Sequence, residues 1–500
     1  MERITRGYVP NLLLFINVLM AIVYISWWFY LPHMGNVFLY ALLFFGEIYH
    51  IIMSFGFWYT IWNRKIPKRV TSPNYFDPSV TVFITVAGEP VDIVTRTIKA
   101  AKEMNYPNFK VVVLNDGFVA NKENWKEIER TSQDLGVECI TRRIPGGAKA
   151  GNINNGLRST QSELVAIFDA DMIPNKDFLS KLVPYFYDEK VAFVQSPQFY
   201  KNFDQNEITR GAWEQQDLFF GPIMSAKDNL NSSFICGTNL VLRRKALEDV
   251  GGINEKSIAE DFLTSYFIHK RKWKSVYYPN ILAEGLAPLD LLSYYKQQQR
   301  WARGSLEILF RYNPFFRRGF TFAQRVEYFL SALFYLNGLI VLIDIIMPIL
   351  FLFFGLQPVS STTQSFALYF IPYMFLNLYT IFLVSGGGIT FRAISFSQAS
   401  WFLQLSALFS LLTRRKVGFA VTSKKRQEGN YLFLIYPHLL YIVLAVIGIA
   451  LNLDNKNPAV FTNSAWAIFN IIMFLPFIKA AYNWRSFFIF RQSPNIGYQE

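Results

Sequence analysis

Six apolar stretches, each close to the length that crosses a bilayer, constrain this chain more than any other feature. They cover residues 12–30, 37–62, 328–354, 366–384, 432–449 and 466–481. A bilayer core about 30 Å thick needs about 20 apolar residues in a helix, and it offers no water to satisfy an open sheet edge. The chain is therefore expected to be a membrane protein with six spanning helices. Its 52% hydrophobic residues, 49 Phe and only 17% charged residues agree with this expectation.

The basic residues predict the orientation in the membrane. Arg3 and Arg6 precede the first stretch and a basic run at 63–69 follows the second, so the amino terminus is expected in the cytoplasm. The first stretch lacks a small-residue cleavage site and is expected to be an anchor, not a signal peptide. Because the basic residues flank apolar stretches, the formal charge of +13 indicates anionic lipid and a phosphorylated substrate, and no nucleic-acid partner is expected. Two cysteines imply no disulfide framework.

Residues 78–290 have the composition of a globular domain. Strands are expected at 80–86, 109–114 and 164–172, with a helix at 91–104 between the first two. This alternation predicts an α/β fold on a parallel sheet, which binds its ligands at the carboxyl ends of the strands.

The strand at 164–172 ends in two carboxylates, Asp169 and Asp171. Alternation along a strand predicts that both side chains point to the same side. They could hold Mg²⁺ or Mn²⁺, with substrate phosphates supplying further oxygens. The alternative is a surface turn, because Asp-x-Asp occurs often by chance. Asp116 is expected at the end of the strand at 109–114, and the Gly-rich segment 146–152 leads into a helix.

Two helices further along carry charged and aromatic residues. Glu260 and Asp261 open a helix expected to run to about residue 271. Carboxylates are favoured at a helix amino terminus, so a structural cap is the alternative to a chemical role. Residues 294–304 predict an amphipathic helix at the membrane surface, where Trp301 could also be an interfacial anchor.

Glu47 and Asp344 interrupt two of the apolar stretches. An ionisable side chain inside a span costs about 2.5 to 3.5 kcal/mol on insertion scales. Both are therefore expected to face the protein interior or a wet path. The alternative is a pairing between spans that only holds the bundle together.

Five short segments, in this order, carry a resemblance to a known family. They are Asn115-Asp116-Gly117, Lys149-Ala150-Gly151-Asn152, Asp169-Ala170-Asp171, Ala259-Glu260-Asp261 and Gln297-x-x-Arg300-Trp301. The set resembles the motifs of processive family 2 glycosyltransferases, and QxxRW is its specific member. Residues 419–424, Phe-Ala-Val-Thr-Ser-Lys, fit the FxVTxK gating-loop motif of cellulose synthases. The resemblance implies a GT-A-type α/β glycosyltransferase domain, with a mixed and mostly parallel sheet, inserted in a helical transmembrane bundle.

The resemblance also implies roles for the motif residues. Asp261, helped by Glu260, would be the general base that takes the proton from the acceptor hydroxyl. Asp169 and Asp171 would hold the Mg²⁺ or Mn²⁺ that neutralises the leaving diphosphate. The nucleotide sugar would be bound by Glu89, Asp116, Lys149, Asp169, Gln297, Arg300, Thr422 and Lys424. The growing polymer would be bound by Trp301, Cys236, Gly237 and Thr238, with Trp301 stacked on a sugar.

Two motifs depart from the family pattern. The usual Thr-Glu-Asp is Ala259-Glu260-Asp261, which keeps both acids and loses a hydroxyl. The usual Asp-Asp-Gly is Asn115-Asp116-Gly117, which leaves Asp116 as the acid there. Bacterial cellulose synthases commonly carry a carboxyl-terminal cyclic-di-GMP domain, whereas this chain ends soon after its last apolar stretch. Regulation by that nucleotide is expected to need another subunit.

The expected layout has six parts. They are two transmembrane helices at 1–70, a cytoplasmic glycosyltransferase domain at 78–290, amphipathic interface helices with QxxRW at 291–325, two transmembrane helices at 326–386, a cytoplasmic interface helix and gating loop at 387–430, and two transmembrane helices with a short cytoplasmic tail at 431–500. The protein would be a multi-pass protein of the plasma (inner) membrane.

The resemblance implies a processive, inverting enzyme that elongates a β-glucan from UDP-glucose and moves the polymer out through its own spans. Its partners would be the UDP-sugar donor, the growing polysaccharide and the lipid membrane. Alternatives are a synthase of another β-linked polymer, such as a (1,3)- or mixed-linkage glucan, hyaluronan, chitin or poly-N-acetylglucosamine, and a non-processive enzyme that charges a lipid phosphate with one sugar. From a different class, the chain could be a transporter or channel whose globular insert only regulates it. Such a protein has no need of the ordered motifs.

Overall fold

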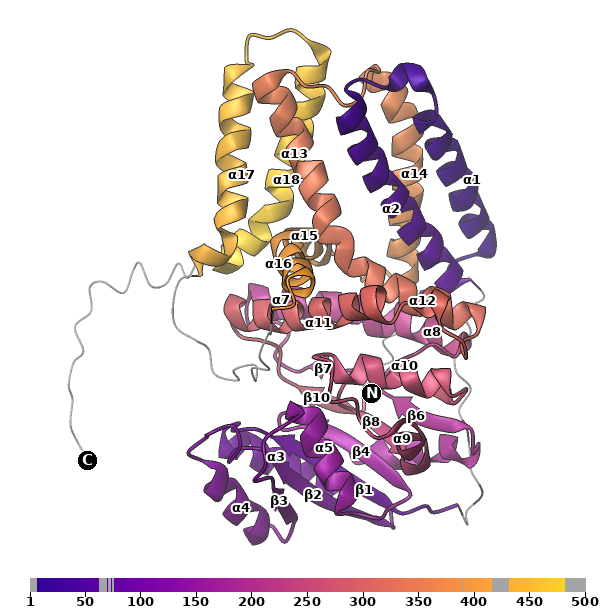
Figure 1. The fold of residues 1–500 in the computed structure, drawn as a ribbon, viewed down its shortest axis with the longest axis vertical. Helices are drawn as coiled ribbons and strands as arrows, with labels where there is room; N and C mark the ends of the chain where they lie inside the picture. Colours follow the sequence, from indigo (N-terminus) through magenta and orange to yellow (C-terminus); the bar gives the residue numbers. More distant parts are fainter. Residues whose placement is uncertain are drawn as a thin grey trace, which may run out of the picture.

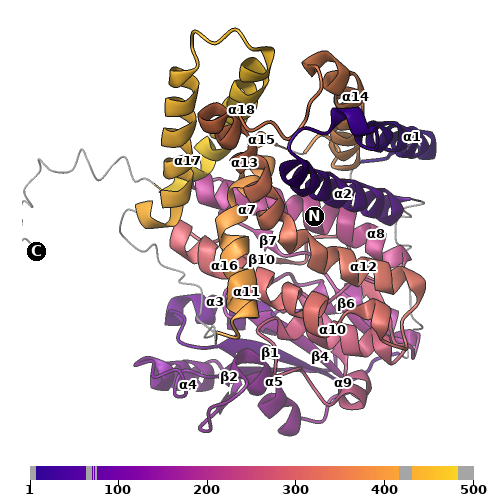
Figure 2. The same cartoon turned by 45° about the horizontal axis from the view of Figure 1, so that its top comes forward.

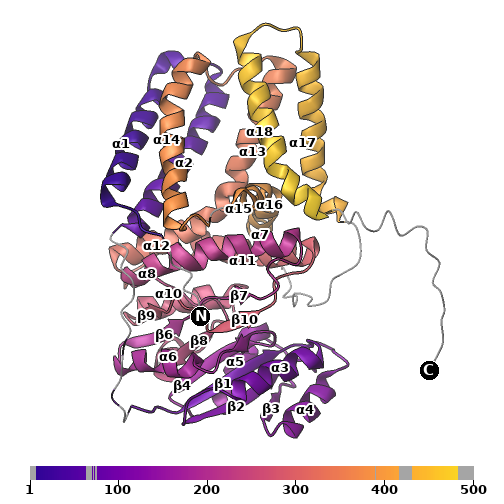
Figure 3. The ribbon, with the colours of Figure 1, turned by 180° about the vertical axis from the view of Figure 1, so that it is seen from behind.

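The computed structural model describes residues 7–62, 70, 73, 76–388, 390–415 and 431–481, and it arranges them in three layers (Figure 1). A bundle of long helices forms one end, an α/β unit forms the other, and a layer of helices lies crosswise between them. The view from behind has the same three layers (Figure 3). The FxVTxK segment, with Thr422 and Lys424, and the basic run at 63–69 lie outside the described residues.

The α/β unit contains a seven-stranded sheet in the order β3-β2-β1-β4-β8-β6-β9. Its strands are β1 (Val80–Val86), β2 (Phe109–Asn115), β3 (Glu138–Thr141), β4 (Leu164–Asp169), β6 (Val191–Gln195), β8 (Leu240–Arg243) and β9 (Lys274–Tyr277). β1 to β4 pair in parallel, as do β6 and β9, whereas β8 is antiparallel to both β4 and β6. Because β8 is reversed, its first residue, Leu240, pairs with Ile167 near the end of β4.

Helices cover this sheet because its strands are apolar on both faces. All seven residues of β1 are buried, as expected for a central parallel strand. The helices of the unit are α3 (Val91–Lys102), α4 (Trp125–Asp134), α5 (Ala148–Arg158), α6 (Phe178–Leu182), α9 (Arg244–Val250) and α10 (Glu260–Lys270). The strands and the first helix thus form where the sequence predicts them, with ends that differ by up to three residues.

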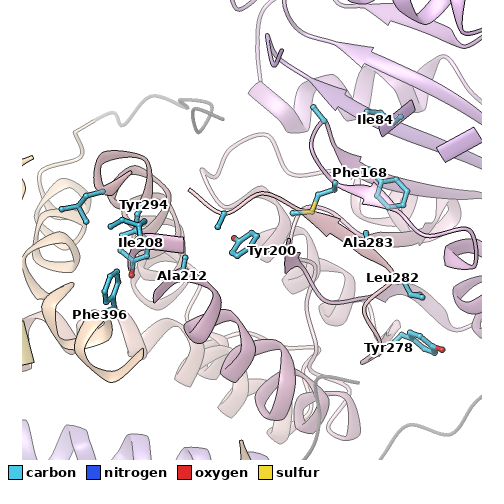
Figure 4. Packing of buried hydrophobic residues seen from close by; sticks show 14 of the residues in the cluster. Ile84, Phe168, Tyr200, Ile208, Ala212, Tyr278, Leu282, Ala283, Tyr294 and Phe396 are labelled. Atoms are coloured by element: carbon cyan, nitrogen blue, oxygen red, sulfur yellow. The ribbon is translucent and has the colours of Figure 1, made fainter. Parts of the chain in front are cut away.

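A three-stranded sheet in the order β5-β10-β7 joins the α/β unit to the crosswise layer. It consists of β5 (Ile173–Pro174), β7 (Phe199–Tyr200) and β10 (Ala283–Gly285). One hydrophobic cluster runs from Ile84 and Phe168 in the large sheet, through Tyr200 and Ala283, to Tyr294 and Phe396 in the crosswise layer (Figure 4). The small sheet therefore lies in a continuous core between the two layers.

The crosswise layer is built from helices that are far apart in the sequence. It contains α7 (Glu207–Leu218), a π-helical turn (Phe219–Ile223), α8 (Met224–Asn229), α11 (Leu291–Arg311), α12 (Phe322–Leu333), α15 (Phe391–Ala399) and α16 (Trp401–Leu412). Figure 2 shows α11 and α16 crossing each other. Arg392 of α15 pairs with Glu207 and Glu214 of α7 at 2.8 and 2.9 Å, and Lys479 contacts Glu207 at 3.2 Å.

Six helices of the described chain are long and apolar enough to cross a membrane. They are α1 (Asn11–Trp28), α2 (Val37–Ile61), α13 (Asn337–Phe354), α14 (Thr363–Val384), α17 (Leu432–Leu451) and α18 (Pro458–Ala481). The apolar helical segment that contains α13 begins with α12 and covers Phe322–Phe354.

The apolar stretch predicted at 328–354 is divided by a 3₁₀ turn at Phe334–Leu336, and only α13 stands in the bundle. The residues before the turn bind α10 of the α/β unit and α8 of the crosswise layer instead. The Tyr328 hydroxyl lies 2.7 Å from His269 Nδ1, and the buried Glu327 accepts a hydrogen bond of 2.5 Å from Lys227. These contacts hold α12 in the crosswise layer.

Candidate active site

Asp169 and Asp171 lie together at the carboxyl edge of the sheet, although only Asp169 belongs to a strand. β4 ends at Asp169, and the Met172 amide then donates to the Asp169 carbonyl at 3.0 Å, which forms a turn. The prediction that strand alternation aligns the two side chains is therefore wrong. Asp171 is 4% exposed and accepts a hydrogen bond of 3.2 Å from the Leu286 amide beside the small sheet. Its burial also argues against the alternative of a plain surface turn.

Asp116 follows β2 and is held by an arginine that the sequence did not single out. Arg142 donates from Nε and Nη2 to the two Asp116 carboxylate oxygens at 2.7 and 2.6 Å. Burial raises the pKa of Asp116, and Arg142 partly offsets this effect. The arginine also donates to the carbonyls of Gly146 and Ala148, so it links Asp116 to the Gly-rich loop.

Asn115, which replaces the usual first acid, has a structural role. Its side-chain amide donates to the Trp125 carbonyl at 2.9 Å, and its side-chain oxygen accepts from the Gly117 amide at 2.9 Å. An acid could not donate the first of these bonds when ionised. Asn115 thus fixes the loop that carries Asp116.

The Gly-rich loop turns the chain into α5 and delivers Lys149. Gly146 and Gly147 have φ angles of 140° and 65°, which a side chain rarely permits. Lys149 lies in the first turn of α5, donates to the Gly237 carbonyl at 2.8 Å and pairs with Asp169. Burial lowers the pKa of Lys149, but Asp169 and Glu260 outweigh it, so the net pKa is raised and the ammonium is retained.

Residues 236–238 lie between Lys149 and Asp261. A β-carbon added at Gly237, which has a φ of 79°, would lie 3.1 Å from an Asp261 carboxylate oxygen and 3.5 Å from the Lys149 nitrogen. The Thr238 hydroxyl accepts from the Asp169 amide at 2.9 Å. Burial raises the pKa of the Cys236 thiol, and Asp261 adds to this effect. The reversed β8 explains this position, because the residues that lead into it reach the edge where β4 ends.

Glu260 and Asp261 begin α10, as predicted, and both carboxylates have a raised pKa. Burial, followed by the neighbouring Glu260 charge, raises the pKa of Asp261 to about 7, while Lys149 and Arg300 oppose the change. Burial also raises the pKa of Glu260. Asp261 does accept a hydrogen bond of 2.7 Å from the Phe262 amide, but a solvent-exposed cap would not have its pKa raised in this way.

Ala259 fits a close contact between α10 and α11. A β-carbon added at Gly304 of α11 would lie 2.2 Å from the Ala259 β-carbon, so the two helices approach closely there. The Ser257 hydroxyl accepts a hydrogen bond of 3.2 Å from the Ala259 amide. Ser257 therefore supplies a hydroxyl near the place where the family motif has its threonine.

α11 brings the QxxRW residues over this site. Gln297 hydrogen-bonds the buried Tyr200 hydroxyl, which also interacts with Asp171 and Asp169. Arg300 interacts electrostatically with Glu260 and Asp261. Trp301 is half-buried on the same helix. At the end of β1, the Glu89 carboxylate is turned to the backbone and accepts from the Ala87 amide at 2.6 Å.

The donor set fits a divalent cation held jointly with a diphosphate. Asp169 and Asp171 supply hard carboxylate oxygens, the Asp169 side chain is 38% exposed, and Lys149 places a positive charge on it. Within the described part of the chain, no group of three or more His, Cys, Asp or Glu could hold a metal ion. The remaining ligands would therefore have to come from phosphate oxygens or water.

Sequence reasoning missed Arg142 and Tyr200. Arg142 directly follows β3 at the same sheet edge, so the rule that predicted Asp116 could also have found it. Tyr200 gave no such signal, because it belongs to a two-residue strand whose partner, Gly285, is distant in the sequence.

Comparisons with known proteins agree with this geometry. Residues 78–304 match the family model described as "Glycosyltransferase like family 2", and residues 248–453 match "Cellulose synthase". The chain is 29% identical over 446 residues to the cellulose synthase catalytic subunit [UDP-forming] of Pseudomonas fluorescens, covering 85% of this chain and 59% of that protein. It is 33% identical over 303 residues to the subunit of the same name from Xanthomonas axonopodis pv. citri, covering 59% of this chain and 41% of that protein.

A solved structure shares the fold. The mannosyltransferase PcManGT from Pyrobaculum calidifontis, in complex with GDP-Man and Mn²⁺, superposes with a TM-score of 0.53 at 17% identity, covering 76% of this chain and all of that one. The α/β unit thus has the predicted GT-A-type glycosyltransferase fold. The curated relatives are longer, and the chain spans about 60% of the first and less of the second. Residues 78–304 thus carry a family 2 glycosyltransferase domain, and residues 248–453 carry a cellulose synthase domain.

Proposed function

We propose that the protein is a processive, inverting glycosyltransferase that elongates a β-glucan from UDP-glucose and passes it through its own helix bundle. The observation that carries the proposal is the meeting of Asp261, Lys149 and Asp169 around Gly237. The similarity to UDP-forming cellulose synthase subunits supports UDP as the leaving group.

The donor would lie along the carboxyl edge of the sheet. Asp116, oriented by Arg142, and Glu89 would border the nucleoside, while Lys149, Gln297 and Arg300 would face the diphosphate. Arg300 can offer a fork of donors to phosphate oxygens. A Mg²⁺ or Mn²⁺ on Asp169 and Asp171 would supply charge stabilisation to the diphosphate when bound.

The acceptor would enter from the side of α11. Trp301 would offer a flat apolar face to a pyranose, and residues 236–238 would border the terminal sugar. Asp261 would take the proton from the acceptor hydroxyl as that oxygen attacks the anomeric carbon and the bond to the diphosphate breaks. A base with a pKa of about 7 is well matched to neutral pH.

The membrane arrangement follows from the same proposal. The six helices would span the plasma (inner) membrane, with the α/β unit in the cytoplasm, where UDP-sugars are available. The predicted division at 1–70, 78–290, 291–325, 326–386, 387–430 and 431–500 is part of this proposal, with α12 assigned to the crosswise layer. Any accessory subunits would join this assembly as further partners.

Thr422 and Lys424 would act on the donor through the FxVTxK segment. A hydroxyl and an ammonium could bind the diphosphate only when it is present. We expect Phe419→Ala or Lys424→Ala to lower synthesis at least about tenfold, whereas Lys425→Ala has little effect. A basic loop that only binds anionic lipid, worth about 1 kcal/mol per residue, would give equal and mild losses for Lys424→Ala and Lys425→Ala.

One experiment tests the proposed function directly. The purified protein in lipid nanodiscs is incubated with each labelled UDP-sugar and Mg²⁺ or Mn²⁺, and the product is digested with linkage-specific glycanases. UDP release with UDP-glucose and a long glucan are expected, and Asp261→Asn should bind UDP without making polymer. Long polymer from another donor would favour a different β-linked product. Transfer of a single sugar to lipid would contradict processive synthesis.

A further inference from the structure

Glu47, His50 and Asp344 form an ionisable cluster inside the helix bundle, separate from the residues of the active site. Glu47 and His50 lie in the middle of α2, and Asp344 lies in the middle of α13. His50 Nε2 is 3.5 Å from Asp344 Oδ2. The buried Tyr24 hydroxyl of α1 interacts with Glu47.

The cluster faces the inside of the bundle. On α13, Ile340 and Phe351 share a face with Asp344 and are 0% and 6% exposed, whereas Ile346, about 200° further round, is 40% exposed. On α2, Ile52 is 43% exposed and points about 200° away from His50. The expectation that Glu47 and Asp344 avoid the lipid-facing side is therefore confirmed for Asp344 and agrees with the placement of Glu47, three residues before His50.

Despite this inward direction, the cluster retains accessible surface. The side chains of His50 and Asp344 are 41% and 34% exposed, although buried residues flank them on the same helix faces. Towards the outer end, α2 and α13 close on each other through the buried Leu39, Ile343 and Met347. A pairing that only fastened two helices would have covered these polar groups, since uncovered polar surface in a membrane is costly.

The chemistry of the cluster restricts what it can contact. It does not have the geometry of a metal site in the described chain. Two carboxylates and an imidazole can donate to and accept from many hydroxyls. The helices α1, α2, α13, α14 and α17 contain no Lys or Arg, and α18 has only Lys479 near its end. A polyanion would therefore meet two carboxylates and no fixed positive charge halfway across the membrane.

We propose that Glu47, His50 and Asp344 form a contact site for the exported glycan between α2 and α13, and that this site suits a neutral, hydroxyl-rich polymer and disfavours one built from uronic acids. The inference rests on the proposed function and narrows its substrate class. It also disfavours the hyaluronan alternative on physical grounds. The contacts would be hydrogen bonds to hydroxyl groups, so the three side chains would have to be polar but would not have to be charged.

Two triple variants test the site in nanodiscs. One replaces the cluster by amides, Glu47→Gln, His50→Gln and Asp344→Asn, and the other replaces all three residues by Leu. The leucine variant is more apolar than the natural chain, so membrane insertion should not suffer. UDP binding to each variant checks the catalytic part, and Thr380→Val, which removes a buried hydroxyl between α14 and α1, is the matched control.

The measured quantities are UDP release and polymer length. The amide variant and Thr380→Val should make polymer within about twofold of the natural length, and the leucine variant should make polymer at least about tenfold shorter, as expected when more than one hydrogen bond is lost. Full-length polymer from the leucine variant would overturn the inference alone. Equal losses in both triple variants would mean that charge is required, and long uronate-containing polymer from the natural chain would show that the site tolerates a polyanion. Either result also overturns it. A natural protein that releases no UDP from any donor would overturn the proposed function as well.

Discussion

The pKa of Asp261 makes a quantitative prediction about the rate of polymer synthesis. A base with a pKa of about 7 is about half ionised at pH 7, about one tenth at pH 6 and about one hundredth at pH 5. Synthesis should therefore fall about tenfold for each pH unit on the acid side. This acid limb of the pH–rate profile reports the titration of Glu260 and Asp261 as a pair, because the charge of each affects the pKa of the other.

Glu260→Gln should move this limb to lower pH. The Glu260 charge is the second cause of the raised pKa, after burial. Two charges a few ångströms apart in a protein repel by a few kcal/mol, and one pH unit corresponds to about 1.4 kcal/mol. The midpoint should fall by about one pH unit or more, so the rate at pH 6 should rise from about one tenth to about half of the plateau. The exposed Glu248→Gln on α9 is the matched control.

Initial rates of UDP release between pH 5 and 9, at saturating donor, measure the effect. An unchanged midpoint in Glu260→Gln, or a shift to higher pH, would refute the electrostatic coupling between the two acids. Thermal unfolding can also check the direction of the pKa shift of Asp261. Because the pKa of Asp261 is raised from 3.8 to about 7, ionising it costs the folded state up to about 4 kcal/mol above pH 7 and nothing below pH 4. Asp261→Asn should therefore raise the unfolding temperature at pH 8 more than at pH 5.

Three further changes probe other parts of the molecule. Asp169→Asn should weaken UDP binding and remove its dependence on Mn²⁺ in calorimetry, and unchanged metal dependence would exclude this carboxylate as a ligand. Arg142→Gln should weaken UDP binding about tenfold by freeing Asp116, whereas Arg143→Gln, which removes a surface cation stacked on aromatic rings, should not. Glu327→Ala leaves a buried lysine unpaired and should destabilise the folded protein by about 3 to 5 kcal/mol in thermal unfolding, and a loss below about 1 kcal/mol would show that water reaches this pair.

The sequence predicts the parts of the site that depend on local patterns. β1, β2 and α10 form where hydrophobic periodicity and helix-start signals place them, so Asp116 and Asp261 were found directly. Contacts between distant segments were not predictable in this way. Asp171 leaves the strand for a turn held by Leu286, and Tyr200 is positioned by a strand that comes some 85 residues later.

The division between α12 and α13 shows the same limit. Hydropathy alone joins residues 322–354 into one apolar helix. Tyr328 instead hydrogen-bonds His269 of α10, and Glu327 pairs with Lys227 of α8. Tertiary hydrogen bonds thus decide where the span begins, and no window of neighbouring residues contains them. The reversal of β8, which places residues 236–238 beside Asp169, depends equally on pairing and not on propensity.

The position of α7 and α8 in the chain, between β7 and β8, has a practical consequence. α7 binds Arg392 of α15 and Lys479 of α18 through Glu207, α8 binds Glu327 of α12 through Lys227, and the chain then returns to complete the sheet. A fragment that contains the whole seven-stranded sheet also contains α7 and α8, whose surfaces are covered by other helices in the intact protein. Such a fragment is not expected to be a soluble, self-contained enzyme. If the α/β units of two relatives were exchanged, α15 and α18 would have to be exchanged with them, because these helices bind α7. The α/β unit and the helix bundle should consequently be inherited together.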